Sequence, residues 1–184
     1  MATATDTPTT LPAGTWSIDP AHSSVEFQVK HMGIATVKGF FSEFEGLLEV
    51  AEDGTITAGG TVEAASVNTR AAQRDAHLRS ADFLDADNHP QLRFRSNSVQ
   101  PLDEDSNRIV GELTIRGVTR EVELHAVAQG VEQDPWGNTR VGLEVTGEID
   151  REEFGLTWNQ ALESGGVLVG KKVKLLLDLS AVKA

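Results

Sequence analysis

Polar and apolar residues alternate with a period of two along most of the chain. Near the start, the apolar residues Val25, Phe27 and Val29 are separated by single polar or charged residues. Such alternation places successive side chains on opposite faces of a β-strand, one apolar and one in water. The pattern predicts about eight strands, at residues 16–32, 36–50, 55–67, 90–100, 107–116, 119–133, 138–151 and 171–182.

The links between these runs are short and rich in turn-forming residues, as at Glu52-Asp53-Gly54 and Arg116-Gly117. Short links join antiparallel neighbours, so we expect consecutive strands to pair in chain order. A twisted sheet of eight long strands would leave two exposed edges, and closure into a barrel removes them. The sequence therefore predicts an all-β fold, an eight-stranded antiparallel barrel.

Two stretches interrupt the alternation, and both fall between strands, near the expected barrel ends. Residues 69–80 are rich in helix formers and predict one helix, with Asn68 or Thr69 as its N-cap. Residues 152–170 contain several glycines and predict a long loop with at most one helical turn. We expect these segments to cover the barrel ends.

Side-chain size on the apolar face decides whether such a barrel is hollow, because eight strands enclose just enough room for packed side chains or one small ligand. Many inward positions are small: Ala58, Gly60, Ala64, Gly111, Ala126, Ala128 and Gly147. One interpretation is an elongated apolar cavity lined by these residues, by Phe27, Phe40, Phe44 and Phe94, and by the leucines of 175–179. The other is a barrel packed solid, in which the glycines bend strands and the alanines allow close packing.

Composition narrows the chemistry. The chain has 184 residues, which suits one domain, and no cysteine, which excludes disulfides, thiolate nucleophiles and cysteine-ligated metals. Its formal net charge of −12 disfavours nucleic acid and anionic membrane surfaces as partners. No window approaches the roughly 18 apolar residues of a membrane span, so stable membrane insertion is not expected.

The N-terminal residues 1–14 are rich in Thr, Ala and Pro. We expect a flexible arm there, followed by a barrel domain at 15–184. The arm has neither the basic n-region nor the apolar run of a secretory signal peptide. A cytoplasmic location is therefore expected.

Specific blocks of residues add a resemblance to this pattern. They occur at 16–27, 31–41, 66–69, 74–84, 111–120 and 151–156, beginning with Trp-Ser-Ile-Asp-Pro-Ala-His at Trp16. In this order the blocks resemble the YceI-like, polyisoprenoid-binding family, from about residue 15 to 182. The resemblance implies a lipocalin-like extended barrel that holds a long isoprenoid or similar amphiphilic chain in an elongated pore, without catalysis. Family members are often exported to the periplasm or cell surface, whereas this sequence shows no leader.

Polar candidates cluster on the predicted helix. Arg70, Arg74 and His77 follow at i, i+4 and i+7 and would form one positive stripe near the expected barrel mouth. Arginine suits bidentate capture of phosphate, so this stripe is the candidate partner of a phosphate, pyrophosphate or carbonyl head group. The alternative is a solvated helix face in which Asp75 pairs with the arginine at i+4. Trp158, in the second interruption, is a candidate cover for the pore.

Motifs of catalysis and metal binding are not found in the sequence. The histidines at 22, 31 and 89 lack the i, i+4 spacing or the HExxH form of a strong metal site. There is no G-x-S-x-G elbow, P-loop or dinucleotide fingerprint. Asp75 and His77 lie two residues apart on the predicted helix, which turns their side chains about 200° away from each other. We expect no catalytic residue, metal or cofactor, apart from a bound isoprenoid or fatty lipid.

The sequence therefore predicts a non-enzymatic protein that binds, transports or stores a long-chain isoprenoid, such as a quinone or polyprenyl species, or a similar amphiphilic lipid. The candidate ligand-binding residues are Phe27, His31, Phe40, Phe44, Gly60, Asn68, Arg74, Asp75, His77, Phe83, Phe94, Gly111, Leu113 and Trp158. The alternatives are a structural or interaction barrel that acts through its surface or as a homodimer, and a metal-assisted enzyme.

Overall fold

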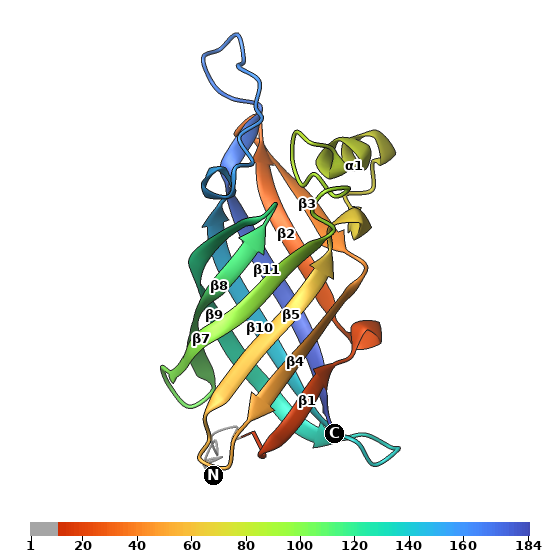
Figure 1. Ribbon diagram of the computed structural model, residues 1–184, viewed down its shortest axis with the longest axis vertical. Helices are drawn as coiled ribbons and strands as arrows, with labels where there is room; N and C mark the ends of the chain where they lie inside the picture. Colours follow the sequence, from red (N-terminus) through yellow and green to blue (C-terminus); the bar gives the residue numbers. More distant parts are fainter. Residues whose placement is uncertain (1–10) are drawn as a thin grey trace, which may run out of the picture.

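Eleven strands of the computed structural model, which describes residues 11–184, form one antiparallel sheet that closes into a barrel (Figure 1). The first six strands are β1 (Gly14–Ile18), β2 (Ser24–His31), β3 (Ala35–Phe41), β4 (Phe44–Val50), β5 (Ile56–Glu63) and β6 (Val67–Asn68). The other five are β7 (Gln91–Pro101), β8 (Ser106–Ile115), β9 (Val118–Gln133), β10 (Thr139–Asp150) and β11 (Val169–Lys183).

Four short helical segments complete the described chain. They are the α-helix α1 (Ala72–Arg79) and the 3-10 turns η1 (Pro20–His22), η2 (Ala64–Ser66) and η3 (Arg151–Phe154). Within residues 11–184, no helix has the length and apolar character needed to cross a bilayer.

The strands pair in the order predicted from the short links. β4 pairs with β1 and β5, and the order continues through β7, β8, β9 and β10 to β11, which pairs with β1. In addition, β11 pairs with β2, β2 with β3 and β3 with β6. Three predicted strands are each split in two, into β1 and β2, β3 and β4, and β5 and β6. When each pair is counted as one strand, the eleven strands make a ring of eight. The predicted all-β barrel is confirmed.

Three of the predicted strands are interrupted part-way along their length. η1 separates β1 from β2, Ser42 and Glu43 separate β3 from β4, and η2 separates β5 from β6. The second and third interruptions are hydrogen-bonded to each other, since the Ser42 N–H donates to the oxygen of Ser66 at 3.2 Å. They divide the barrel into an upper part, beside α1 in Figure 1, and a lower part, near the C-terminus.

The interruptions also change which residues face inward. On β3 the odd-numbered Phe41 borders the interior, whereas on β4 the even-numbered Phe44 does. Inward residues of an uninterrupted strand are an even number of positions apart, but Phe41 and Phe44 are three apart. The break at Ser42 and Glu43 therefore shifts the alternation by one residue, which turns side chains to the other face. Phe40 lies opposite the exposed Glu26 on the outer face. The prediction that Phe40 lines a cavity is wrong for this reason.

Trp16 closes the lower end of the barrel. Its side chain is fully buried, and its indole N–H donates to the oxygen of Pro12 at 3.1 Å. Around it pack Val50, Val141, Leu143 and Ala181. The predicted N-terminal arm lies outside the described residues except for 11–14, where Leu11 packs against this cluster and Gly14 begins β1.

The helix at the upper end is shorter than predicted. α1 begins without a side-chain N-cap, and Asp75 from inside the helix accepts hydrogen bonds from the N–H and hydroxyl of Thr69 at 2.8 and 2.6 Å. Arg70 precedes the helix with a positive φ of 63°, so the chain turns sharply there. The predicted stripe of Arg70, Arg74 and His77 on one helix face is therefore wrong. The loop predicted at 152–170 is confirmed, with η3 as its helical turn.

Candidate functional site

The barrel interior contains two adjoining cavities, of about 230 Å³ and about 260 Å³. The first, which we name the lower cavity, reaches Leu48 and Leu179, whereas the second, the upper cavity, lies beside α1. Both are bordered by Phe27, Phe41, Leu92, Ile115, Ile149 and Leu175. Because they share these side chains, the two cavities adjoin along the barrel, and taken together they have a size that small-molecule pockets commonly have.

The lower cavity is almost entirely apolar. Five of the predicted ligand-binding residues line it: Phe27, Phe44, Gly60, Phe94 and Leu113. Of the other predicted inward residues, Ala58, Ala126, Leu175, Leu177 and Leu179 also line it. Such walls desolvate an apolar chain and offer dispersion contacts, but they provide few groups that would orient a polar ligand.

Some inward glycines leave room for a large side chain on the neighbouring strand and do not enlarge the cavity. A Cβ on Gly111 would lie 2.6 Å from Cζ of Phe94 and 2.5 Å from the oxygen of Arg95. Gly147 gives similar room to Leu124, because a Cβ there would lie 2.5 Å from a Leu124 methyl carbon. Gly111 borders neither cavity. Its prediction as a lining residue is wrong, because the ring of Phe94 on the neighbouring strand occupies the space that the missing side chain leaves.

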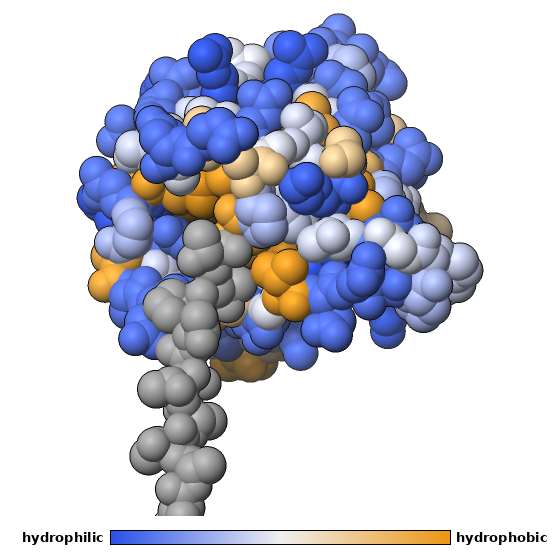
Figure 2. All heavy atoms as spheres, turned by 90° about the horizontal axis from the view of Figure 1, so that it is seen from below, coloured by the Kyte–Doolittle hydropathy of each residue, from blue (hydrophilic) through white to orange (hydrophobic). Residues whose placement is uncertain are grey.

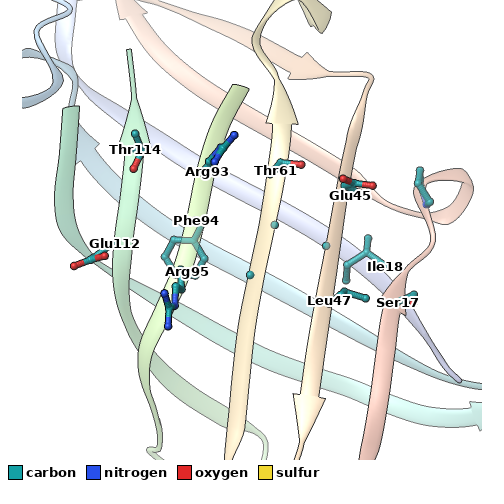
Figure 3. A pocket seen from close by; sticks show the side chains of 14 residues that line it. Ser17, Ile18, Glu45, Leu47, Thr61, Arg93, Phe94, Arg95, Glu112 and Thr114 are labelled. Carbon is teal, nitrogen blue, oxygen red and sulfur yellow. The ribbon is translucent and has the colours of Figure 1, made fainter. Parts of the chain in front are cut away.

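Gly46 and Gly60 have a different surrounding. They lie opposite each other on β4 and β5, and a Cβ on Gly60 would lie 2.7 Å from the oxygen of Glu45. With no side chain at either position, the wall is thin, and both glycines border the lower cavity and a shallow outer groove of about 860 Å³. Figure 3 shows this groove with Arg93 and Arg95 projecting from β7. The lower cavity thus comes closest to the outer surface at the glycine pair.

Three aromatic rings gather in the upper cavity. The ring of His77, from α1, lies 4.6 Å from Trp158 and 5.0 Å from Phe83, centroid to centroid, and Phe83 lies 5.4 Å from Trp158. All three, which the sequence offered as ligand-binding candidates, line the upper cavity. His77 is held by a contact of 2.8 Å between its Nε2 and Asp82. The rings form one wall against which a flat or apolar group can pack.

Arg151 and Lys30 also line this cavity, and the sequence interpretation missed both; Arg151 is the buried one. Its side chain is buried, and it donates to the backbone oxygens of Leu156, Trp158, Val169 and Gly170 at 2.6 to 3.2 Å. Burial lowers its pKa from the ordinary value, and it takes part in no salt bridge among residues 11–184. The negative charges of Glu152 and Asp150 oppose this lowering of the pKa. The guanidinium in the upper cavity is thus hydrogen-bonded to backbone oxygens and to no carboxylate of residues 11–184. The block at 151–156 that carried the family resemblance was the available signal.

Two further ligand-binding candidates, Arg74 and His31, also line the upper cavity. Arg74 donates from Nε to the hydroxyl of Thr69 at 2.7 Å and from an Nη to its backbone oxygen at 2.8 Å. These bonds fix the guanidinium beside the start of α1. His31 ends β2, at the rim of the cavity.

Two predicted contacts of a ligand head group have structural roles instead. Asp75 is buried and holds Thr69, while the side-chain oxygen of Asn68 accepts the N–H of Arg70 at 2.8 Å. Neither Asp75 nor Asn68 borders a cavity. Their prediction as binding residues is wrong, because their oxygens shape the turn that leads into α1. Within residues 11–184, no three His, Asp or Glu side chains are grouped as a metal site requires.

Comparisons with known proteins fit this architecture. A family model described as a YceI-like domain matches residues 16–181. A UPF0312 protein of Staphylococcus aureus strain bovine RF122 / ET3-1 is 41% identical over 162 residues, which cover 86% of this chain and 92% of that protein. Another, from strain N315, has the same identity and coverage.

Solved structures share the barrel. The YCEI protein of Campylobacter jejuni is 26% identical, with a TM-score of 0.72 over 84% of this chain and 90% of that one. BcnA of Burkholderia cenocepacia is 21% identical, with a TM-score of 0.75 over 89% and 98% of the two chains. A polyisoprenoid binding domain from Saccharophagus degradans, implicated in plant cell wall breakdown, is 14% identical, with a TM-score of 0.70 over 92% and 98%. The last two, at such low identity, establish the fold alone.

Proposed function

The chain belongs to the YceI-like domain family, and from this premise we propose that it binds a long-chain isoprenoid, or a similar amphiphilic lipid, inside the barrel. The apolar tail lies in the lower cavity and the polar head lies in the upper cavity. The ligand is bound and released chemically unchanged, so the protein serves as a carrier or a store.

The change in polarity along the interior is the observation that carries this proposal. Glu26, Glu45, Thr61 and Arg93 border the lower cavity, but its walls are almost wholly apolar. The upper cavity adds Arg74, His77 and Arg151. A ligand that matches both parts has an apolar chain at one end and a polar group at the other. Each CH₂ transferred from water contributes about 0.8 kcal/mol, so the tail supplies most of the affinity.

The head group is defined by Arg151 and the aromatic rings. A guanidinium has five N–H donors, and the backbone oxygens around Arg151 take four of them. The remaining donor and the buried positive charge favour a head with an acceptor oxygen, either a phosphate or the carbonyl of a quinone. A phosphate gains more than a carbonyl, because its charge offsets that of the buried cation.

The polyisoprenoid-binding neighbour from Saccharophagus degradans supports the ligand class, since its barrel has the same fold. The alternative of a barrel that is packed solid and acts through its surface lacks comparable support, because the interior holds two cavities.

Native mass spectrometry of the purified protein, followed by organic extraction, tests the proposal. We expect a prenyl or fatty species to be carried through purification, or a long-chain polyprenyl phosphate added in vitro to bind at one per chain. Protein that is repeatedly empty and also rejects added lipids would overturn it.

A comparison of head groups sharpens the same experiment. A polyprenol and the polyprenyl phosphate of equal chain length share the tail, so any difference in affinity reports on the upper cavity. We expect the phosphate to bind more tightly, and this preference to disappear in Arg151→Met. Equal affinities for both lipids in the unaltered protein would place the head outside the upper cavity.

A further inference from the structure

Two loops extend the barrel beyond the upper cavity and expose apolar side chains. One is the turn between β2 and β3, and the other is the segment 161–168, which rises above the barrel at the top of Figure 1. Their exposed residues are Ile34, at 82% of its full accessibility, Val167 at 48% and Met32 at 44%. We name these two loops the upper tip.

Hydrogen bonds hold the two loops together. The N–H of Met32 donates to the oxygen of Leu168 at 2.8 Å, which ties the β2–β3 turn to the second loop. Within that loop, Ala161 and Val167 form an isolated antiparallel bridge, and the N–H of Leu162 donates to the oxygen of Gly166 at 2.8 Å. The apolar side chains are therefore displayed by a hydrogen-bonded, convex structure.

Lysine is concentrated beside the upper tip, among carboxylates of the neighbouring strand β10. All six lysines lie on β2, β3 and β11, and five of them are on the parts of these strands that lead to the tip: Lys30, Lys38, Lys171, Lys172 and Lys174. On β10, Glu148 and Asp150 are the register partners of Lys174 and Lys172. Lys171 pairs with Glu152 at 3.4 Å, whereas the other four take part in no salt bridge among residues 11–184. Glu163 is the one carboxylate in the two loops.

The upper tip also adjoins the upper cavity. Lys30, His31, Leu168 and Val169, which flank or belong to the two loops, all line that cavity. Whatever surface the tip rests on therefore lies next to the cavity that would receive a head group.

We propose that the upper tip docks reversibly on a phospholipid bilayer that contains anionic lipids. Ile34, Met32 and Val167 enter the head-group layer, and the flanking lysines contact lipid phosphates. Apolar side chains on a convex tip, ringed by lysine, are what such a layer accommodates. The net charge of −12 argues against anionic membranes only if the charge is evenly spread, and here the lysines are gathered at one end.

A second copy of this chain is a poorer occupant. A stable protein interface takes roughly 20–30 residues from each partner, and the tip offers three exposed apolar side chains on narrow loops. The docking proposal rests on the proposed function only for its purpose, the exchange of a membrane lipid with the barrel. The docking itself depends on the tip alone.

The absence of cysteine makes a direct test simple. Ile34→Cys is labelled with an environment-sensitive fluorophore and mixed with vesicles of phosphatidylcholine and phosphatidylglycerol. We expect a blue shift that weakens as salt is raised or as phosphatidylglycerol is omitted. Leu102→Cys, at an exposed residue in the turn between β7 and β8 near the lower end, serves as the control and should not shift.

Sedimentation with the same vesicles compares matched substitutions at the two ends. The lower end also shows separate apolar patches (Figure 2), and Trp136, in the β9–β10 turn there, is 81% exposed, close to the value for Ile34. Ile34→Ser should weaken vesicle binding at least about tenfold, while Trp136→Ser should leave it unchanged. Absence of vesicle binding in the unaltered protein, or an equal loss in both variants, would overturn the proposal.

Two further measurements separate this inference from the proposed function. Farnesyl diphosphate binding without vesicles is measured for the unaltered protein and for Ile34→Ser, and we expect both to bind equally. If no prenyl lipid binds but vesicle binding depends on Ile34, docking stands and the proposed function fails. If Ile34→Ser instead converts a dimer to a monomer in light scattering, the tip is a self-interface and the docking proposal is wrong.

Discussion

The guanidinium of Arg151 donates to the backbone oxygen of Trp158 at 3.0 Å, so one hydrogen bond joins the buried cation of the upper cavity to its aromatic wall. The ring of Trp158 in turn lies 4.6 Å from that of His77 on α1. The position of the wall therefore depends on Arg151, the first residue of η3, whose Cζ also lies 6.0 Å from the centre of the Phe83 ring.

Replacing Arg151 should destabilise the fold and loosen the loop after η3. Arg151→Met keeps much of the side-chain volume but leaves four backbone oxygens without their donor. We expect a loss of about 2–4 kcal/mol in the free energy of unfolding, measured in urea, and faster hydrogen exchange in residues 156–170. Arg120→Met, at an exposed site, is the control and should change stability by less than about 0.5 kcal/mol. Equal stability of the two variants would contradict the structural role.

Filling the lower cavity should block uptake of the tail. Ala58 lines the cavity, whereas its neighbour Thr57 is exposed on the outer face of β5. Ala58→Phe should weaken lipid binding at least about tenfold by occupying the space of several methylenes. Thr57→Phe should bind as the unaltered protein does. Circular dichroism checks that both variants fold, since overpacking costs about 1–3 kcal/mol. Normal uptake by folded Ala58→Phe would mean that the tail lies elsewhere.

Gly39 and Phe27 should be energetically coupled. They are paired across β2 and β3, and a Cβ on Gly39 would overlap the ring of Phe27. Gly39→Ala should therefore cost about 1–3 kcal/mol, although alanine ordinarily suits a strand better than glycine. In the background of Phe27→Leu, which removes the ring, the same substitution should cost much less. A double-mutant cycle in urea measures the coupling, and strictly additive effects would refute it.

Acid should weaken the attachment of the first interruption to β10. Arg140 donates to Asp19 at 2.9 Å and to Asp134 at 2.8 Å, and these bonds lower the pKa of each carboxyl from 3.8 to about 2. Because the folded-state pKa is the lower one, the stability gained is complete above the unfolded value and is lost as the pH falls from about 4 toward 2.

Arg140→Gln tests this pH dependence. We expect its urea midpoint to fall less than that of the unaltered protein between about pH 5 and pH 2, because its carboxyls titrate nearer their ordinary pKa. Arg120→Gln is the control, because Arg120 is exposed and its guanidinium donates to the backbone oxygen of Thr119 rather than to a carboxylate. Parallel pH profiles for all three proteins would show that Arg140 does not set the pKa values.

Alternation predicted the barrel because it is a property of whole strands. The errors arise where a few residues reset the pattern. The predicted strand ran unbroken over residues 36–50, so alternation placed Phe40 on the same face as Phe44. Nothing in the sequence marks Ser42 and Glu43 as a break that shifts this alternation by one residue. A single offset of this kind leaves the strand order intact and inverts the assignment of every side chain beyond it.

The candidate site was less predictable because it depends on contacts between distant strands and loops. Gly111 reads as an opening in the wall, yet its space belongs to Phe94 on the neighbouring strand. Arg151 ends a run of alternation and reads as an exposed strand end. Its burial follows from four loop oxygens that converge on it, and their positions are fixed only once the loop is folded. Aromatic residues such as Trp158 were predictable, since rings seek apolar walls whatever the exact contacts.

The break between β3 and β4 has a consequence for how the length of such barrels can change. Because β3 and β4 are phased independently on either side of Ser42 and Glu43, an inserted or deleted pair of residues above the break does not re-register the strand below it. One half of the barrel is thereby free to acquire a deeper chamber while the other half keeps its packing. Two residues added to β3 would thus lengthen the upper part of the barrel and leave the inward faces of the lower part unchanged.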